Sequence, residues 1–139
     1  MEKPLEVALV TSAAFDLRDK HYSDREALGF KVGTKENPVK ITANQLRMNK
    51  KFMVNTAEKI RNMLRIMHKK GHRHLVLEAF GCGVFANPPK LIAGIFKKIF
   101  LEEEFRGQFK TVYFAILKIF ENDSANIEAF TSMCQKLNK

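Results

Sequence analysis

The stretch HLVLEAFGCGVFANPP, which runs from His74 to Pro89, decides the fold of this chain. It begins with an apolar run that predicts a buried strand, passes through a turn bracketed by Gly81 and Gly83, and ends at two prolines that open a helix. Such a turn suits a phosphorylated ligand, because glycines let backbone amides approach phosphate oxygens next to a helix N-terminus. The alternative is a tight turn without a ligand, since tight turns use glycine regardless of function.

Length and composition bound the class of protein. The 139 residues, of which 45% are hydrophobic, are enough for one domain with a single core. The formal net charge of +9 favours a polyanionic partner, although charge alone does not distinguish nucleic acid, a nucleotide polymer and a membrane surface. Two distant cysteines, no leader-like start and no apolar run near the roughly 18 residues of a membrane span predict an intracellular protein, cytoplasmic or nuclear, without a membrane partner.

Hydrophobic patterning along the rest of the chain predicts alternating strands and helices. Strands are expected at residues 5–10, 74–80 and 111–117, the second one buried on both faces. Helices are expected from about Ala43 or Asn49 to Lys70, from Pro88 and Pro89 to about Phe100, and from an N-cap at Asp123 or Ser124 onward. This order calls for a parallel sheet with right-handed crossovers and helices on both faces.

Two loops are the candidate site, because ligands of such sheets bind outside the carboxyl ends of the strands. The primary loop follows the second predicted strand, and the secondary loop follows the first. The predicted ligand-binding residues are Gly81, Cys82, Gly83, Val84, Phe85, Ala86 and Asn87 in the primary loop, with Thr11, Ser12, Ala13, Ala14 and Phe15 in the secondary loop.

Other chemistries have weaker support. Cys82 lies between two glycines, but no basic partner for a nucleophile is evident, so a packed thiol is the preferred interpretation. His68 and His72 have a spacing that suits a metal, yet Gly71 is expected to end the helix between them, and no metal is predicted.

The acidic cluster at residues 102–104 is expected to be a solvated helix end. The long helix carries a basic face that is either solvated or a polyanion-binding surface, formed by Lys50, Lys51, Lys59, Arg61, Arg65, Lys69 and Lys70.

The motif LVLEAFGCGVFANPP, followed by LIAGIFKKIF and FKTVYFAIL, resembles the microbial-type poly(ADP-ribose) glycohydrolase family, a branch of the macrodomain fold. The upstream segment VALVTSAAFDLR is similar to that family's strand and loop before the long helix, so the resemblance covers most of residues 7–130. It implies a three-layer αβα fold, of which residues 1–139 form a single partial domain that lacks the N-terminal half. It also implies that residues 81–85 bind the diphosphate of ADP-ribose and that Phe85 positions the ribose.

The chain also departs from the family in ways that limit the expected activity. The family carries its catalysis on an earlier glycine-rich loop that ends in paired glutamates, whereas no Gly-Gly-Gly and no Gln-Glu-Glu occurs in these 139 residues. No catalytic residue and no cofactor is therefore assigned, and the chain alone is expected to be inactive. Glu78 and Ala86 stand where small glycines are usual in the family. The family's sheet also places a strand between the first two strands of this chain, which suggests a homo-oligomer or a complementing chain.

The resemblance thus predicts a protein that recognises ADP-ribose, poly(ADP-ribose) or ADP-ribosylated proteins. One alternative is an active glycohydrolase that a second chain completes. Another is a basic interaction module that binds nucleic acid or protein through the long helix.

Overall fold

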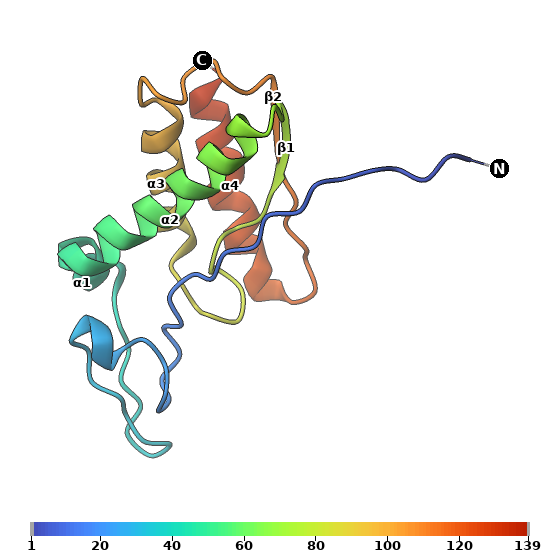
Figure 1. Cartoon of the computed structure of the whole chain (residues 1–139). Helices are drawn as coiled ribbons and strands as arrows, with labels where there is room; N and C mark the ends of the chain where they lie inside the picture. Colours follow the sequence, from blue (N-terminus) through green and yellow to red (C-terminus); the bar gives the residue numbers. More distant parts are fainter. Residues whose placement is uncertain (1, 139) are drawn as a thin grey trace.

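The computed structural model describes residues 2–138 and shows an α/β arrangement (Figure 1). Its elements, in chain order, are α1 (Ala43–Met48), α2 (Lys50–Lys69), β1 (His74–Leu77), α3 (Pro89–Phe100), β2 (Thr111–Phe114) and α4 (Ser124–Leu137), with short 3-10 helices at Glu26–Leu28 and Glu121–Asp123. The strands β1 and β2 pair in parallel, with His74 opposite Thr111 and Leu77 opposite Phe114. The expected α/β class with a parallel sheet is therefore confirmed.

The long predicted helix is present but is divided in two at Asn49. The backbone of Asn49 is extended, and its side-chain oxygen accepts a hydrogen bond from the amide of Phe52 at 2.9 Å, which caps the start of α2. At the other end Gly71 adopts a left-handed conformation with φ of 83°, and the amide of His72 donates to the carbonyl of Met67 at 3.0 Å. This is the glycine C-cap that the sequence predicts.

The core lies between the sheet and the helices α2, α3 and α4. Pro89 occupies the first turn of α3 as predicted, and the buried stripe of this helix points into the core. The ring of Phe96 in α3 lies 5.2 Å from the ring of Phe114 in β2 and 5.9 Å from the ring of Phe130 in α4. Aromatic contacts therefore join both helices to one face of the sheet.

The strand predicted at residues 5–10 is wrong, because this segment forms no strand. Its chain is extended, and the apolar side chains of Leu5 and Leu9 are 88% and 86% exposed. Figure 1 shows the segment leaving the body of the molecule toward the N-terminus. A strand needs a neighbour to accept and donate its backbone hydrogen bonds, and among the described residues no segment pairs with this one.

The two strands that do form are shorter than predicted, and β1 is buried on one face instead of both. Leu75 and Leu77 point into the core, whereas Val76 and its cross-strand neighbour Tyr113 are 70% and 66% exposed. The predicted double burial is wrong because, among residues 2–138, no helix covers Val76 and Tyr113. The structure therefore holds part of a layered α/β domain, and one face of its sheet is open.

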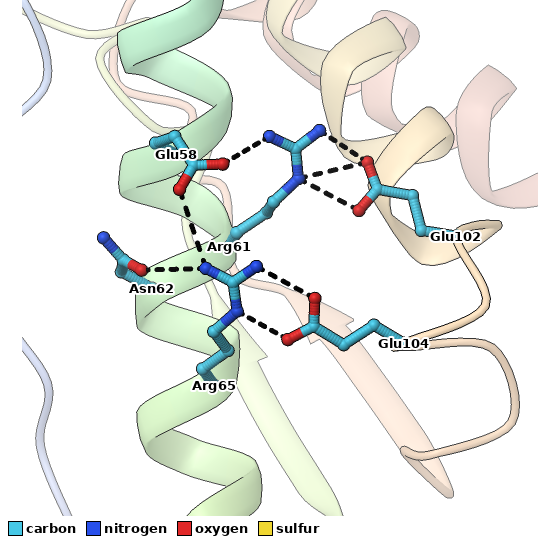
Figure 2. Close-up of polar contacts among 6 residues, drawn as sticks. All are labelled: Glu58, Arg61, Asn62, Arg65, Glu102 and Glu104. Atoms are coloured by element: carbon cyan, nitrogen blue, oxygen red, sulfur yellow. Dashed lines mark hydrogen bonds and ion pairs between the residues drawn. The ribbon is translucent and has the colours of Figure 1, made fainter.

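A network of charged side chains joins α2 to the segment after α3 (Figure 2). The guanidinium of Arg61 donates to Glu102 at 2.6 and 2.9 Å and to Glu58 at 2.6 Å. One turn further along α2, Arg65 donates to Glu104 at 2.9 Å. The expectation that residues 102–104 form a solvated helix end is therefore wrong for Glu102, which is partly buried against Arg61. Glu103 and Glu104 are exposed as expected, although Glu104 also binds an arginine that is distant in the sequence.

Within residues 2–138, no helix combines the length and the hydrophobicity that crossing a membrane requires.

Replacing Arg61 by alanine should lower the free energy of unfolding by about 1 to 2 kcal/mol, because Glu102 and Glu58 lose a shared charged donor. Chemical denaturation followed by circular dichroism measures the change. Lys69→Ala, at an exposed position of the same helix, is the control and should change stability by less than about 0.5 kcal/mol. Equal losses for the two variants would show that the network does not stabilise the fold.

Candidate functional site

The two predicted loops meet, and the side chain of Asn87 holds them together. Its amide nitrogen donates to the carbonyl of Phe15 in the secondary loop at 2.7 Å. The same nitrogen lies 2.9 Å from the carbonyl of Gly81 and 3.3 Å from that of Phe85, while the backbone amide of Asn87 also donates to Gly81 at 2.9 Å. Asn87 is buried, so its side chain closes the primary turn and ties it to the secondary loop.

A cavity of about 270 Å³ lies where the loops meet. The secondary loop contributes Ser12, Ala13 and Ala14, and the primary loop contributes Gly81, Gly83, Val84 and Phe85. Residues 78–80, which link β1 to the turn, complete the lining. The other predicted site residues do not line the cavity: Thr11 and Phe15 are the two ends of the secondary loop, and Cys82, Ala86 and Asn87 support the primary loop.

The glycines that bracket the turn have different roles. Gly81 has φ of 74°, and a Cβ atom there would lie 2.6 Å from the Cβ of Ala14, so the contact between the two loops needs glycine. Gly83 does not use the left-handed region, and a Cβ atom there would meet nothing within 4 Å. The backbone at Gly83 therefore faces open space. Ala86 adopts φ of 57°, a conformation that glycine takes without strain.

Three consecutive amides of the primary loop are free to bind a ligand. Within residues 2–138, the backbone N–H groups of Gly83, Val84 and Phe85 have no hydrogen-bond acceptor. A run of unpaired amides in a turn attracts anions, because each N–H carries a partial positive charge. The N-terminus of α3 contributes less to the attraction of an anion than the sequence suggested, because no residue of α3 lines the cavity.

Two basic side chains that the sequence did not assign to the site border the loops. The ammonium of Lys59 in α2 donates to the carbonyl of Ala13 at 2.8 Å and lies 4.5 Å from the ring centroid of Phe15. The guanidinium of Arg18 lies 5.3 Å from the ring centroid of Phe85. Lys59 belongs to the predicted basic face of the long helix, and only the packing of α2 against residues 13–15 brings it to the loops.

Acidic groups offset part of this positive charge. Asp16 binds Arg18 at 2.6 and 2.8 Å, and this hydrogen bond lowers the pKa of Asp16 to about 2, so the pair stays ionised at neutral pH. Glu78 is exposed and lines the cavity itself. Its carboxylate would repel an anionic ligand.

Cys82 is a packed thiol, as predicted. Its S–H donates to the carbonyl of Phe80 at 3.6 Å, and its own carbonyl accepts from the side-chain amide of Asn126 at 3.3 Å. Burial raises the pKa of the Cys82 thiol to about 12, because a thiolate would lose its hydration. The thiol is thus neutral at physiological pH, a state that disfavours nucleophilic attack.

The histidines near the end of α2 do not converge. His68 bonds through Nε2 to the side chain of Gln108 at 3.0 Å and packs edge-on against Phe109, whereas His72 follows the helix end. In the described part of the chain, no three His, Cys, Asp or Glu side chains are grouped as ligands for a metal ion.

The two glycines allow a direct test of the turn. Gly81→Ala should destabilise the protein by about 3 kcal/mol, because it combines a left-handed alanine with a clash against Ala14. Gly83→Ala should change stability by less than about 0.5 kcal/mol, since its Cβ atom meets open space. Urea denaturation of both variants measures the difference, and equal stabilities would contradict the described geometry of the turn.

The thiol of Cys82 should resist alkylation by iodoacetamide at pH 8 in the folded protein, because it is both buried and protonated. Mass spectrometry of digested protein follows each cysteine separately, with the less buried Cys134 as the internal comparison. Unfolding in urea should make both cysteines react at similar rates. Fast labelling of Cys82 before unfolding would show that the primary loop opens in solution.

Solved structures of bacterial poly(ADP-ribose) glycohydrolases are similar to this chain. The enzyme from Deinococcus radiodurans, solved in complex with ADP-ribose, matches with a TM-score of 0.58 and 31% identity over 67% of this chain and 37% of that one. The enzyme from Thermomonospora curvata matches with a TM-score of 0.57 and 28% identity over 80% of this chain and 35% of that one. The same enzyme bound to the inhibitor ADP-HPD matches with a TM-score of 0.56 and 32% identity, over 63% of this chain and 33% of that one.

No family profile and no curated protein sequence matches the chain. This chain spans only about 36% of the length of the glycohydrolase structures that it resembles. Over about 66% of its own length the chain is similar in sequence and fold to part of the bacterial poly(ADP-ribose) glycohydrolases.

Proposed function

We propose that this chain binds ADP-ribose, free or attached to a polymer or protein, in the cavity between the two loops. The observation that carries the proposal is the run of unpaired amides at Gly83, Val84 and Phe85, three residues that line the cavity, with open space where a Cβ atom on Gly83 would lie. Such a run suits the oxygens of a diphosphate. The glycohydrolase from Deinococcus radiodurans, to which the chain is similar, was solved in complex with ADP-ribose.

In this proposal each group around the cavity has its own role in binding. The amides of residues 83–85 bind the diphosphate, and the ring of Phe85 packs against the adjoining ribose. Lys59 and Arg18 raise the local potential for an anion, whereas Glu78 lowers it. Because attraction and repulsion partly cancel, the affinity of the chain alone is expected to be modest.

We further propose that the chain binds without hydrolysing its ligand. Glycoside hydrolysis needs a general acid beside the bond that breaks and usually a second carboxylate. Among the residues that line the cavity, Glu78 is the single acidic side chain. The absence of a Gln-Glu-Glu run from the sequence supports the same proposal.

The alternative of a basic module that binds nucleic acid through α2 has less support. Arg61 and Arg65 are paired with glutamates, and Lys51 and Lys59 donate to the backbone carbonyls of Ala27 and Ala13. Much of the predicted basic face is therefore occupied by contacts within the chain.

Isothermal titration with ADP-ribose tests the binding proposal. The unaltered chain should release or absorb heat on binding, and Gly83→Glu should weaken affinity at least tenfold, because its carboxylate enters the diphosphate position. Gly94→Glu is the matched control, since Gly94 lies on α3 away from the loops and its Cβ atom also meets nothing within 4 Å. The control adds the same charge and should bind like the unaltered chain.

Two results would count against the proposal. Absence of binding at millimolar ADP-ribose would refute recognition, and equal weakening by both variants would point to net charge instead of the loop. Incubation with poly(ADP-ribose), followed by chromatography of released ADP-ribose, tests inactivity separately. Steady release that Gly83→Glu abolishes would show a complete active site in this chain.

A further inference from the structure

Arg25 is a buried arginine that holds together the two ends of the long loop before α1 (Figure 1). Only 5% of this residue is exposed. Its Nε donates to the carbonyl of Leu17 at 2.8 Å, and its Nη1 donates to the carbonyls of Val39 and Lys31 at 2.7 and 3.4 Å. Nη1 also lies 3.2 Å from a carboxylate oxygen of Asp19. The guanidinium therefore joins residues 17–19 to the far end of the loop.

The third nitrogen of this guanidinium, Nη2, has no hydrogen-bond partner among residues 2–138. It still meets open space, because the buried side-chain atoms without a partner in this part of the chain belong to Ser23, Thr56 and Asn87. A charged group that is taken out of water normally keeps its donors paired, since an unpaired one costs free energy. The structural role of Arg25 therefore accounts for Nε and Nη1 and leaves Nη2 available.

A cavity of about 290 Å³ lies beside Arg25, which lines it. Its apolar walls include Leu17, Ile41 and Leu46, and its lining contains no aromatic ring. Ala86, at the end of the primary loop, also lines it. This cavity shares no lining residue with the cavity between the two loops, so it is a separate site.

The charged side chains that line this second cavity sum to one positive charge. Arg25 and Lys40 are cations, and Asp19 is the single carboxylate. Both oxygens of Asp19 accept hydrogen bonds inside the loop, from the amides of Gly33 and Val39 at 2.7 and 2.6 Å. These amides lower the pKa of Asp19, so it stays ionised at neutral pH. The groups left for a ligand are therefore Nη2 of Arg25 and the ammonium of Lys40, which pairs with no carboxylate in the described part of the chain.

We propose that this cavity binds a small apolar monocarboxylate, with its carboxylate at Arg25 and Lys40 and its aliphatic body against the apolar walls. One negative charge matches the net charge of the lining, whereas a phosphate dianion would exceed it beside Asp19. The volume lies near the lower limit of small-molecule sites, about 300 Å³, which favours a ligand of few atoms over a polymer. The inference does not rest on the binding of ADP-ribose.

Titration of the unaltered chain with isovalerate at neutral pH, followed by heteronuclear NMR of the backbone amides, tests the proposal. The signals of Lys40, Ile41 and Ala86, which line the cavity, should shift and saturate. Isovaleramide has the same aliphatic body without the charge. It should bind about tenfold more weakly, because it lacks the charge-assisted hydrogen bond to the guanidinium.

Two variants test the cations separately. Lys40→Gln should weaken isovalerate binding about threefold and leave isovaleramide binding unchanged, because it removes one charge from the lining. Lys35→Gln is the matched control, since Lys35 is exposed on the same loop but does not line the cavity. Arg25→Gln should remove the preference for the acid, once circular dichroism has shown that the variant folds. The comparison of acid with amide on the unaltered chain does not depend on that variant.

Each outcome decides the proposal. Preferential binding of isovalerate that shifts the cavity signals and is weakened by Lys40→Gln supports it. Equal binding of acid and amide, no shift at tens of millimolar isovalerate, or equal effects of Lys40→Gln and Lys35→Gln would overturn it. Shifts confined to the amides of residues 83–85 would also overturn it, by assigning the carboxylate to the primary loop. Since none of these measurements uses ADP-ribose, failure here is distinguishable from failure of the binding proposal.

Discussion

The candidate site depends on one buried side-chain amide, that of Asn87. Its nitrogen serves three carbonyls from two loops that lie far apart in the sequence, at Phe15, Gly81 and Phe85. Each such bond contributes about 1 kcal/mol, and the loss of the donor would leave the carbonyl of Phe15 unpaired, whereas the carbonyls of Gly81 and Phe85 keep the backbone amides of Asn87 and Leu17 as donors. An aspartate at this position would place oxygen against oxygen. The shape of the turn therefore depends on the side-chain amide of Asn87, which does not line the cavity.

Within the primary loop, one set of residues supports the fold, and another set has backbone amides that are available to a ligand. Gly81, Cys82 and Asn87 are used in packing and hydrogen bonds inside the protein. Gly83, Val84 and Phe85 bulge outward and keep their amides free. The core fixes the supporting residues, and these hold the outward residues in place. The amides of the outward residues remain without hydrogen bonds inside the protein, which is the condition for a preorganised anion site.

Local signals in the sequence predicted the helices and the turn well, whereas features that depend on distant partners were not predictable. Gly71, Pro89 and the apolar stripe of α3 act within a few residues, so their effects could be inferred directly. The pairing of Arg61 with Glu102 spans 41 positions and needs the packing of α2 against the end of α3. Residues 5–10 have the composition of a strand, but composition does not supply the neighbour that a strand requires.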